Sequence, residues 1–236
     1  MATTMKTVVV ITGCSKGGIG FALCEAFASK GCIVYATARR PESLEGFSQP
    51  NVHRLTLDVT DDESVKTVVQ PVIDQEGQID VLVNNAGVSN SSPLIDVDMD
   101  EIMRIFDTNV FATIRTAKAV IPHMAARKRG TVVNVGSIAG NMSVPSNPYD
   151  PQADLLLSLP LAILISRPIP WGGGVYSATK AALHSLTDTL YMECNFWLHI
   201  HVVLLAPGAV RSNIAANKAP RIRLPPDSLY ADYADA

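Results

Sequence analysis

Two side chains late in the chain are spaced for acid chemistry. Tyr176 and Lys180 stand four residues apart in the segment Tyr-Ser-Ala-Thr-Lys. Residues with this spacing on a helix share one face, with Cβ atoms about 5–6 Å apart, so the ammonium would lie beside the phenol. A neighbouring cation favours the phenolate and lowers the pKa of a Tyr from its usual ~10. The pair could therefore donate a proton, the alternative being a surface aromatic beside a solvated Lys.

The composition is that of an ordinary globular chain. The 236 residues are 47% hydrophobic and 17% charged, with a formal net charge of −3. This length favours one large α/β domain with a well-developed core. The charge balance, with no dense block of Lys or Arg, argues against nucleic acid or an anionic membrane surface as the main partner. A small molecule is therefore the favoured ligand.

The cysteine and histidine patterns predict no metal site. The four cysteines have no C-x-x-C spacing and are expected to be reduced thiols of a cytoplasmic protein. No signal peptide is expected before the short apolar run at Val8, and no stretch is long enough for a transmembrane helix. The histidines form no ligand or triad spacing and are interpreted as structural: His53, His123, His184, His199 and His201.

A glycine-rich loop follows the first predicted strand. The β-branched run at residues 7–11 suits a strand buried on both faces of a parallel sheet, and residues 21–30 are typical of an amphipathic helix. Glycines let a backbone approach a pyrophosphate, whose charge is favoured at a helix N-terminus. The order of strand, loop and helix therefore predicts a dinucleotide site, with a ligand-free turn as the alternative. The candidate binding residues in this loop are Gly13, Ser15, Lys16, Gly18, Ile19 and Gly20.

Two arginines stand where an acid is common at the end of the second predicted strand. In NAD-selective units an Asp or Glu there binds the ribose 2′-hydroxyl, whereas Arg39 and a second arginine follow residues 31–38 here. With Lys16 they could bind a doubly charged 2′-phosphate. The sequence thus predicts NADP(H) rather than NAD(H), with exposed arginines at a helix start as the alternative. Asp58, after the third predicted strand, could accept a hydrogen bond from the adenine amino group.

Small and polar residues follow the later predicted strands, where parallel α/β sheets bind ligands. They are Asn85, Ala86 and Gly87 after strand 79–83, Ser137 after strand 131–135, and Pro207, Gly208 and Val210 after strand 200–205. Ser137 alone is also compatible with an ordinary turn serine. Asn109 falls inside a helix predicted over about 99–127, where an Asn is locally unfavourable, so a compensating hydrogen bond is expected.

These motifs occur in one order and together resemble the short-chain dehydrogenase/reductase family over residues 6 to about 212. The ordered elements are Thr12-Gly13, Gly18-Ile19-Gly20, Asn84-Asn85-Ala86-Gly87, Asn109, Ser137, Tyr176-x-x-x-Lys180 and Pro207-Gly208. The resemblance implies an α/β fold with a doubly wound parallel sheet, a Rossmann-type three-layer αβα domain over 1–236. The loop Thr-Gly-Cys-Ser-x-Gly-Gly-Ile-Gly is similar to that of fungal 1-acyldihydroxyacetone-phosphate reductases.

The resemblance also implies an activity, the NADPH-dependent reduction of a ketone in a carbonyl or lipid-like substrate. Tyr176 would protonate the carbonyl oxygen, and Ser137 would polarise it. Lys180 would lower the pKa of Tyr176 and bind the nicotinamide ribose, and Asn109 would anchor a water. The resemblance leaves open a homo-oligomer and, for a cytoplasmic protein, peripheral contact with the endoplasmic reticulum or lipid droplets.

Two departures from the family pattern leave alternatives open. An insert at about 146–170 separates Ser137 from Tyr176; it is interpreted as a translated intron, with a lipid-facing lid or a buried satellite as alternatives. After Ser212 the chain is short and polar, so the C-terminal strand is expected to be missing and the sixth strand to form an edge. A catalytically impaired NADP-binding relative that acts as an interaction partner is therefore the alternative function.

Overall fold

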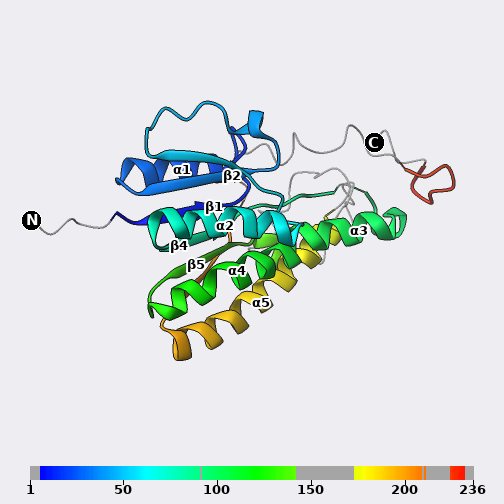
Figure 1. The fold of residues 1–236 in the computed structure, drawn as a ribbon. Coiled ribbons are helices and arrows are strands. Elements are labelled where there is room, and N and C mark those ends of the chain that lie inside the picture. Colours follow the sequence, from blue (N-terminus) through cyan, green and yellow to red (C-terminus); the bar gives the residue numbers. More distant parts are fainter. Residues whose placement is uncertain (1–5, 91, 142–172, 209, 211–223, 232–236) are drawn as a thin grey trace, which may run out of the picture.

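A parallel six-stranded sheet forms the centre of the molecule. The computed structural model describes residues 6–90, 92–141, 173–208, 210 and 224–231. The strands are β1 (Val8–Ile11), β2 (Ile33–Ala38), β3 (Val52–Thr56), β4 (Val81–Asn84), β5 (Thr131–Val135) and β6 (His201–Leu205). Their order in the sheet is β3-β2-β1-β4-β5-β6, and Figure 1 shows β2, β1, β4 and β5 in this order from top to bottom. The order reverses between β1 and β4, which confirms the predicted doubly wound sheet.

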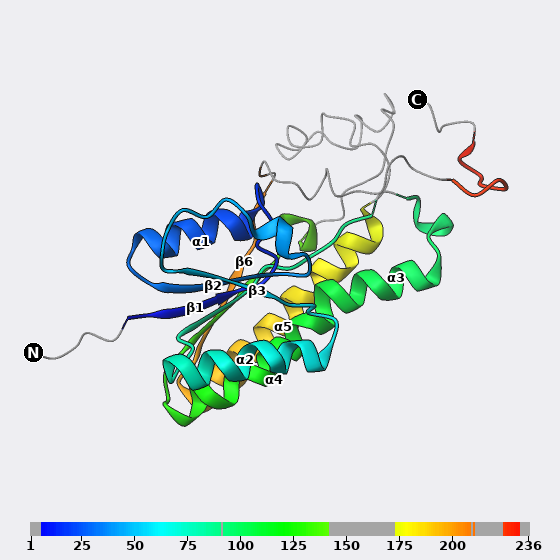
Figure 2. The ribbon, with the colours of Figure 1, turned by 45° about the horizontal axis from the view of Figure 1, so that its top comes forward.

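Helices cover the sheet on both faces and make it the middle of three layers (Figure 2). On one face lies α1 (Ile19–Ser29), and on the other lie α2 (Asp62–Glu76), α4 (Ala112–Ala126) and α5 (Gly174–Leu198). Within the described ranges, no helix combines the length and apolar character needed to cross a membrane.

The helix predicted over about 99–127 is interrupted. It consists of α3 (Met99–Phe106), a five-residue π turn, η3 (Asp107–Phe111), and α4. A π turn inserts an extra residue into a helical turn and is frequent at functional sites. The predicted helical stretch is therefore confirmed, and the turn that contains Asn109 departs from regular α-helical geometry.

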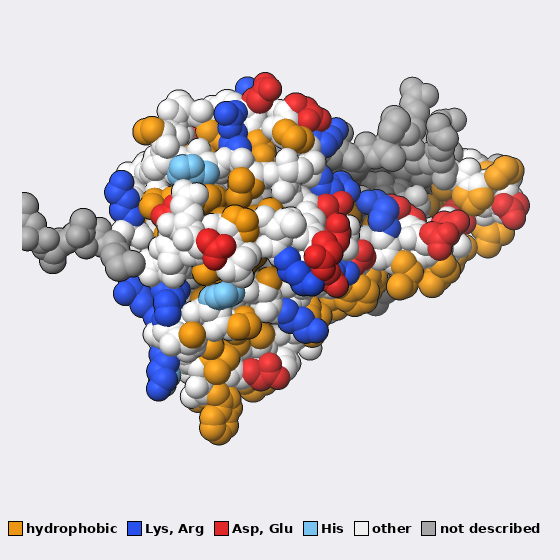
Figure 3. Space-filling model, in the orientation of Figure 1, with side chains coloured by type: hydrophobic (Ala, Val, Ile, Leu, Met, Phe, Trp, Pro, Cys, Tyr) orange, Lys and Arg blue, Asp and Glu red, His pale blue; other side chains and the backbone are white. Residues whose placement is uncertain are grey.

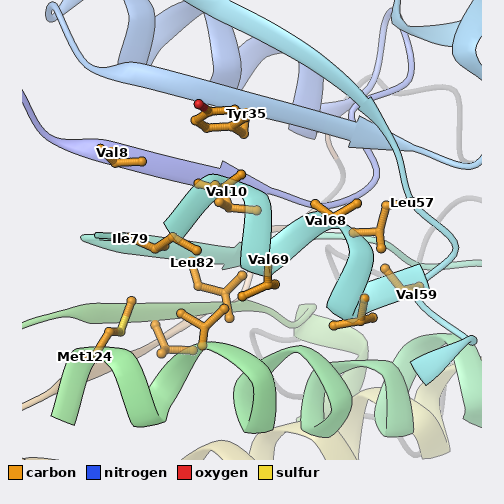
Figure 4. Close-up of a cluster of buried hydrophobic side chains, with 14 of the residues drawn as sticks. Val8, Val10, Tyr35, Leu57, Val59, Val68, Val69, Ile79, Leu82 and Met124 are labelled. Atoms are coloured by element: carbon orange, nitrogen blue, oxygen red, sulfur yellow. The ribbon is translucent and has the colours of Figure 1, made fainter. Parts of the chain in front are cut away.

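Alternation along the strands divides the core into two clusters, because successive strand residues point to opposite faces. Val9, Ile11 and Val34 belong to the cluster on the α1 side. Val8 and residues such as Val10 and Leu82 pack against α2 and α4 (Figure 4). Each fully buried aliphatic side chain contributes roughly 1.5–3 kcal/mol. The first strand is thus buried on both faces, as its β-branched sequence predicts.

The edge strand β6 leaves apolar side chains exposed. Val202 is buried in the cluster on the α5 side, so Val203 and Leu205 face the side on which α1 packs; they are 43% and 42% exposed. The predicted edge position of the sixth strand is confirmed within the part of the chain that the structure describes. A second exposed apolar strip runs along α3, where Met99 and Met103 are 66% and 55% exposed (Figure 3).

A buried chain of hydrogen bonds runs from α4 through the neighbouring strands β4 and β5 to α5, on one face of the sheet. Thr116 Oγ1 donates to Asn84 Oδ1 over 2.7 Å, and Asn84 Nδ2 donates to Asn134 Oδ1 over 2.9 Å. Asn134 Nδ2 donates to Thr187 Oγ1 over 3.0 Å, and that hydroxyl donates to the carbonyl of Leu183 over 2.7 Å. All four side chains are at most 5% exposed. This α4–α5 hydrogen-bond chain holds β4 and β5 together just before the loops that follow them.

Replacing Thr187 by Val should lower the free energy of unfolding by about 1–3 kcal/mol, because the buried amide of Asn134 loses its acceptor. Thr189→Val is the matched control: Thr189 lies on the exposed face of the same helix, where its hydroxyl bonds only Ser185, and the change should stay within about 0.5 kcal/mol. Urea denaturation measures both values. Equal losses in the two variants would show that the buried chain of bonds adds nothing.

Candidate functional site

The carboxyl ends of the parallel strands bring all the predicted site residues to one edge of the sheet. Gly13, Ser15, Lys16, Gly18, Ile19 and Gly20 lie between β1 and α1 or in the first turn of α1; Arg39 and Asp58 follow β2 and β3; Asn85, Ala86 and Gly87 follow β4; Asn109 lies in η3; Ser137 follows β5; Tyr176 and Lys180 lie on α5; Pro207, Gly208 and Val210 follow β6. This edge, at the reversal of strand order, is where such sheets bind ligands.

The glycine loop packs directly on the loop after β4. Gly13 has φ +71, and a Cβ there would lie 2.7 Å from the Cα of Ala86. A Cβ on Gly20 would lie 2.5 Å from Asn85 Nδ2, which itself donates to the carbonyls of Thr12 and Gly13 over 2.9 Å each. Both positions therefore exclude a side chain, and the two loops form one backbone surface.

The hydroxyl of Thr12 orders the same contact from the buried side. Its Oγ1 accepts hydrogen bonds from the backbone N–H groups of Asn85 and Ala86, each over 3.0 Å, and the side chain is 2% exposed. Sequence reasoning assigned no role to this hydroxyl. The sequence did offer one signal for such a role, since this threonine stands directly after a buried strand and before the first glycine of the loop.

The N-terminus of α1 fits an anionic group. Its N-cap is Gly18, which has no side chain to satisfy the first N–H groups, and its first turn carries no acidic residue. Free N–H groups at a helix start favour negative charge. The loop is fixed on its outer side, where Lys16 N donates to the carbonyl of Ser43 over 2.9 Å and Ser15 Oγ donates to Ser43 Oγ over 3.3 Å. A pyrophosphate therefore fits this cradle of glycines and N–H groups.

Arg39 and Asp58 lie at the ends of the neighbouring strands β2 and β3. Burial raises the pKa of the Asp58 carboxyl, but hydrogen bonds from Thr60 and the charges of Arg39 and Arg115 outweigh burial, so the pKa is lowered. Both the backbone N–H and the hydroxyl of Thr60 donate to Asp58 Oδ1, over 2.9 and 2.7 Å. Asp58 is therefore an ionised acceptor beside an exposed guanidinium.

Asn109 joins the π turn to the loop after β4 and to α5. Its Oδ1 accepts from the N–H of Val88 over 2.8 Å, and its Nδ2 donates to the carbonyl of Val88 over 2.9 Å and to Thr179 Oγ1 over 3.0 Å. The side chain is 1% exposed. The expected compensating hydrogen bond is confirmed, and it is supplied by a backbone segment distant in sequence.

Lys180 extends from α5 to the end of β5. Its Nζ donates to the carbonyl of Val135 over 2.7 Å and lies 5.7 Å from the centre of the Tyr176 ring. The side chain is 4% exposed, and burial lowers the pKa of the ammonium to about 8. Gly87 lies close by, since a Cβ built on it would be 3.9 Å from this Nζ and 3.4 Å from Asn109 Oδ1.

Tyr176 shares a hydrogen bond with Ser137. Burial raises the pKa of the Tyr176 phenol above its usual 10, and the hydrogen bond with Ser137 lowers it by less. The pKa of Tyr176 is therefore raised overall, in the direction opposite to the lowering expected from the pair with Lys180. The physical reason is that burial dominates, while the ammonium is directed to the carbonyl of Val135.

The loop after β6 completes this edge of the site. The carbonyl of Pro207 accepts a hydrogen bond from the N–H of Ile138 over 3.1 Å, and Gly208 lies against the same residue. Val210 is 54% exposed, and the structure gives it no contact that argues for a site. The predicted insert at about 146–170 lies outside the described residues.

This fold, with a glycine cradle beside a Tyr, Lys, Ser and Asn cluster, defines a dinucleotide-binding oxidoreductase of the α/β class. The chain belongs to the short-chain dehydrogenase family, whose model, described as short chain dehydrogenase, matches residues 7–149 and 168–222. The matched segments include every predicted site residue and pass over 150–167, within the predicted insert.

Proteins similar to this chain are oxidoreductases by name. A short-chain dehydrogenase/reductase of Pestalotiopsis microspora, GME11361, is 33% identical over 100% of this chain and 71% of its own. The NADPH-dependent 1-acyldihydroxyacetone phosphate reductase of Schizosaccharomyces pombe is 32% identical over 95% of this chain and 68% of its own. A metagenomic short-chain oxidoreductase crystallised with NADP superposes with a TM-score of 0.69 at 28% identity, covering 88% and 84% of the two chains.

Replacing Lys180 by Met should change how stability depends on pH. The pKa of Lys180 is lower in the folded chain, about 8 against 10.5, so the unfolded chain holds the proton more tightly and the wild type gains stability as pH rises from 8 to 10.5. Between pH 7 and pH 10 the wild type should gain about 2 kcal/mol relative to Lys180→Met. Urea titrations at a series of pH values measure this gain, and parallel curves for the two proteins would contradict it.

Proposed function

We propose that the protein is an NADP(H)-dependent carbonyl reductase that converts a ketone to an alcohol, with an acyl-ketone lipid precursor such as 1-acyldihydroxyacetone phosphate as its substrate. The observation that carries the proposal is the contact between Ser137 and Tyr176 with the buried ammonium of Lys180 beside them. A hydroxyl, a phenol and a cation at one place are what a carbonyl oxygen needs as it gains charge and a proton.

NADP(H) is the proposed cofactor because the residues present fit each of its parts. The glycine cradle and the α1 N-terminus would take the pyrophosphate. Arg39, at the end of β2, would take the 2′-phosphate, and Asp58 would accept from the adenine amino group. Lys180, close to Gly87, would bind the nicotinamide ribose. The NADP complex of the metagenomic relative and the name of the Schizosaccharomyces pombe relative support this choice.

The proposed mechanism assigns one task to each side chain of the cluster. When bound, NADPH would supply the hydride that the carbonyl carbon needs. Tyr176 donates its phenolic proton to the carbonyl oxygen, and its raised pKa keeps the phenol protonated at neutral pH. Ser137 Oγ accepts a hydrogen bond from the N–H of Ala139 over 3.2 Å, which leaves its own proton to donate to the same oxygen. Lys180 stabilises the phenolate that forms.

Asn109 has a positioning role in this proposal. It holds both backbone groups of Val88 and also Thr179 Oγ1, one residue before Lys180. The loop that would border the nicotinamide and the helix that carries the acid are therefore fixed relative to each other. A water anchored by Asn109, as in the family, would link Lys180 to solvent protons and remains part of the proposal.

The proposed substrate class follows from the reductase relative. The protein from Schizosaccharomyces pombe is named for a ketone that carries an acyl chain and a phosphate. A panel of acyl ketones with and without phosphate, assayed by NADPH consumption, tests this class. Cofactor-dependent thermal stabilisation of the wild type without turnover on any ketone would instead favour the catalytically impaired relative.

Replacing Tyr176 by Phe should lower kcat by roughly 10²–10⁴-fold, because the ring stays while the acid is lost. The affinity for NADPH should stay within about threefold, since the substitution keeps the ring and leaves every residue proposed to bind the cofactor unchanged. Tyr191→Phe, on the exposed face of the same helix at 44% exposure, is the control and should keep wild-type activity. A Tyr176→Phe protein with full turnover would refute the proposed acid.

Replacing Arg39 by Asp should weaken the preference for NADPH over NADH. A charge-assisted hydrogen bond is worth about 1.5–3 kcal/mol, so the preference for NADPH over NADH in kcat/KM should fall by roughly 10- to 100-fold. Arg129→Asp is the control, since Arg129 is exposed before the amino end of β5, at the opposite edge of the sheet. Unchanged selectivity in Arg39→Asp would contradict the charge argument.

A further inference from the structure

His184 lies beside the proposed catalytic cluster, although its spacing suggested a structural residue. It is on α5, one turn after Lys180 and two turns after Tyr176, and its side chain is 8% exposed. The loop that follows β5 closes around its imidazole. The backbone N–H of Ser137 points to Nε2 over 3.4 Å, and Nδ1 lies 3.0 Å from Asn141 Oδ1.

Two glycines make room for this ring. A Cβ on Gly136 would lie 2.5 Å from Nε2, and a Cβ on Gly140 would lie 2.6 Å from Cε1. Contacts this close exclude any side chain at either position, so the loop is built around the imidazole. Ser137 lies between the two glycines, so the contact of this loop with the imidazole also fixes the position of the Ser137 backbone.

The contacts select one form of the imidazole. A backbone N–H can only donate, so Nε2 facing Ser137 must be the unprotonated acceptor, and the proton is assigned to Nδ1, which donates to Asn141. In a protonated ring, the Nε2–H group would face the N–H of Ser137. Two donors cannot bond each other, so the contact with Ser137 would be lost. The neutral form is thus a condition for this loop geometry.

The charges around the ring favour the neutral form. Burial and the charge of Lys180 lower the pKa of His184, and Asp188 raises it by less. Both charged groups are on α5, and residues 136–141 of the enclosing loop contain no titratable side chain. The unfolded chain therefore binds the proton more tightly. The stability that the neutral ring contributes is fully present above about pH 6.5, and the contact is lost as the pH falls through the lowered pKa of the folded-state imidazole.

We infer that His184 is a positioning residue that sets the Ser137 hydroxyl for catalysis by accepting the hydrogen bond of the Ser137 backbone N–H. The contact itself is independent of the reaction, whereas its catalytic meaning rests on the proposed function. A shift of about 1 Å in a polarising group can cost on the order of 100-fold in rate. The neutral imidazole thereby makes the reduction sensitive to mild acid.

The first experiment tests the contact without turnover. In the wild-type protein labelled with ¹⁵N, the imidazole should show an unprotonated Nε2 and a protonated Nδ1. The Ser137 amide resonance should move with the same midpoint, below pH 6.5, as the imidazole of His184. A protonated Nε2 at neutral pH, or a Ser137 amide that ignores the His184 titration, would overturn the inference.

The second experiment tests the consequence for catalysis. His184→Phe, which keeps an aromatic ring without an acceptor, should lower kcat by roughly 10- to 100-fold with the KM for NADPH unchanged. His184→Gln, which offers an acceptor that does not titrate, should recover part of kcat and lose the acid limb of the wild-type pH profile. His201→Gln, at an exposed position on β6, is the control and should match the wild type.

The outcomes separate the two proposals. Full kcat in His184→Phe, or an acid limb that persists in His184→Gln, would overturn the positioning role. If the wild type reduces no ketone while the imidazole and the Ser137 amide titrate together, the proposed function fails and the contact stands. If His184→Phe does not fold, His184→Gln and the wild-type titration still decide the inference.

Discussion

The contact between the Lys180 ammonium and the carbonyl of Val135 is the interaction on which the candidate site depends. It joins α5 to the end of β5 over 2.7 Å, so the helix that carries Tyr176 stays in place relative to the strand that leads to Ser137. Burial disfavours the charged ammonium, as the lowered pKa of Lys180 shows. The protein thus keeps a buried cation at a cost in stability, a trade typical of functional sites.

Local chemistry explains why much of the architecture could be predicted from the sequence. A β-branched run predicted β1, and glycines directly after it predicted a close backbone approach, which Gly13 and Gly20 make against Asn85. The expected compensating hydrogen bond of Asn109 also followed from a local rule, since an Asn inside a helix is unfavourable. In each case the residue type and its immediate neighbours contain the physical cause.

The remaining features depend on partners that are distant in sequence. The Thr12 hydroxyl binds the N–H of Asn85, 73 positions further on, and the Ser137 N–H meets His184 after 47 positions. The direction of the Tyr176 pKa shift depends on how deeply the assembled fold buries the phenol. The four-residue spacing to Lys180 carries no information about that burial.

The α4–α5 hydrogen-bond chain is homodromic, because every donor in it points the same way. Thr116 donates to Asn84, which donates to Asn134, and Thr187 passes the sequence on to the backbone of α5. In such a chain each bond polarises the next, so the strength of one depends on all the others. The hydrogen bonds that reach α4 and α5 therefore strengthen one another through the two strands between them, and the orientations of the two buried amides depend on each other.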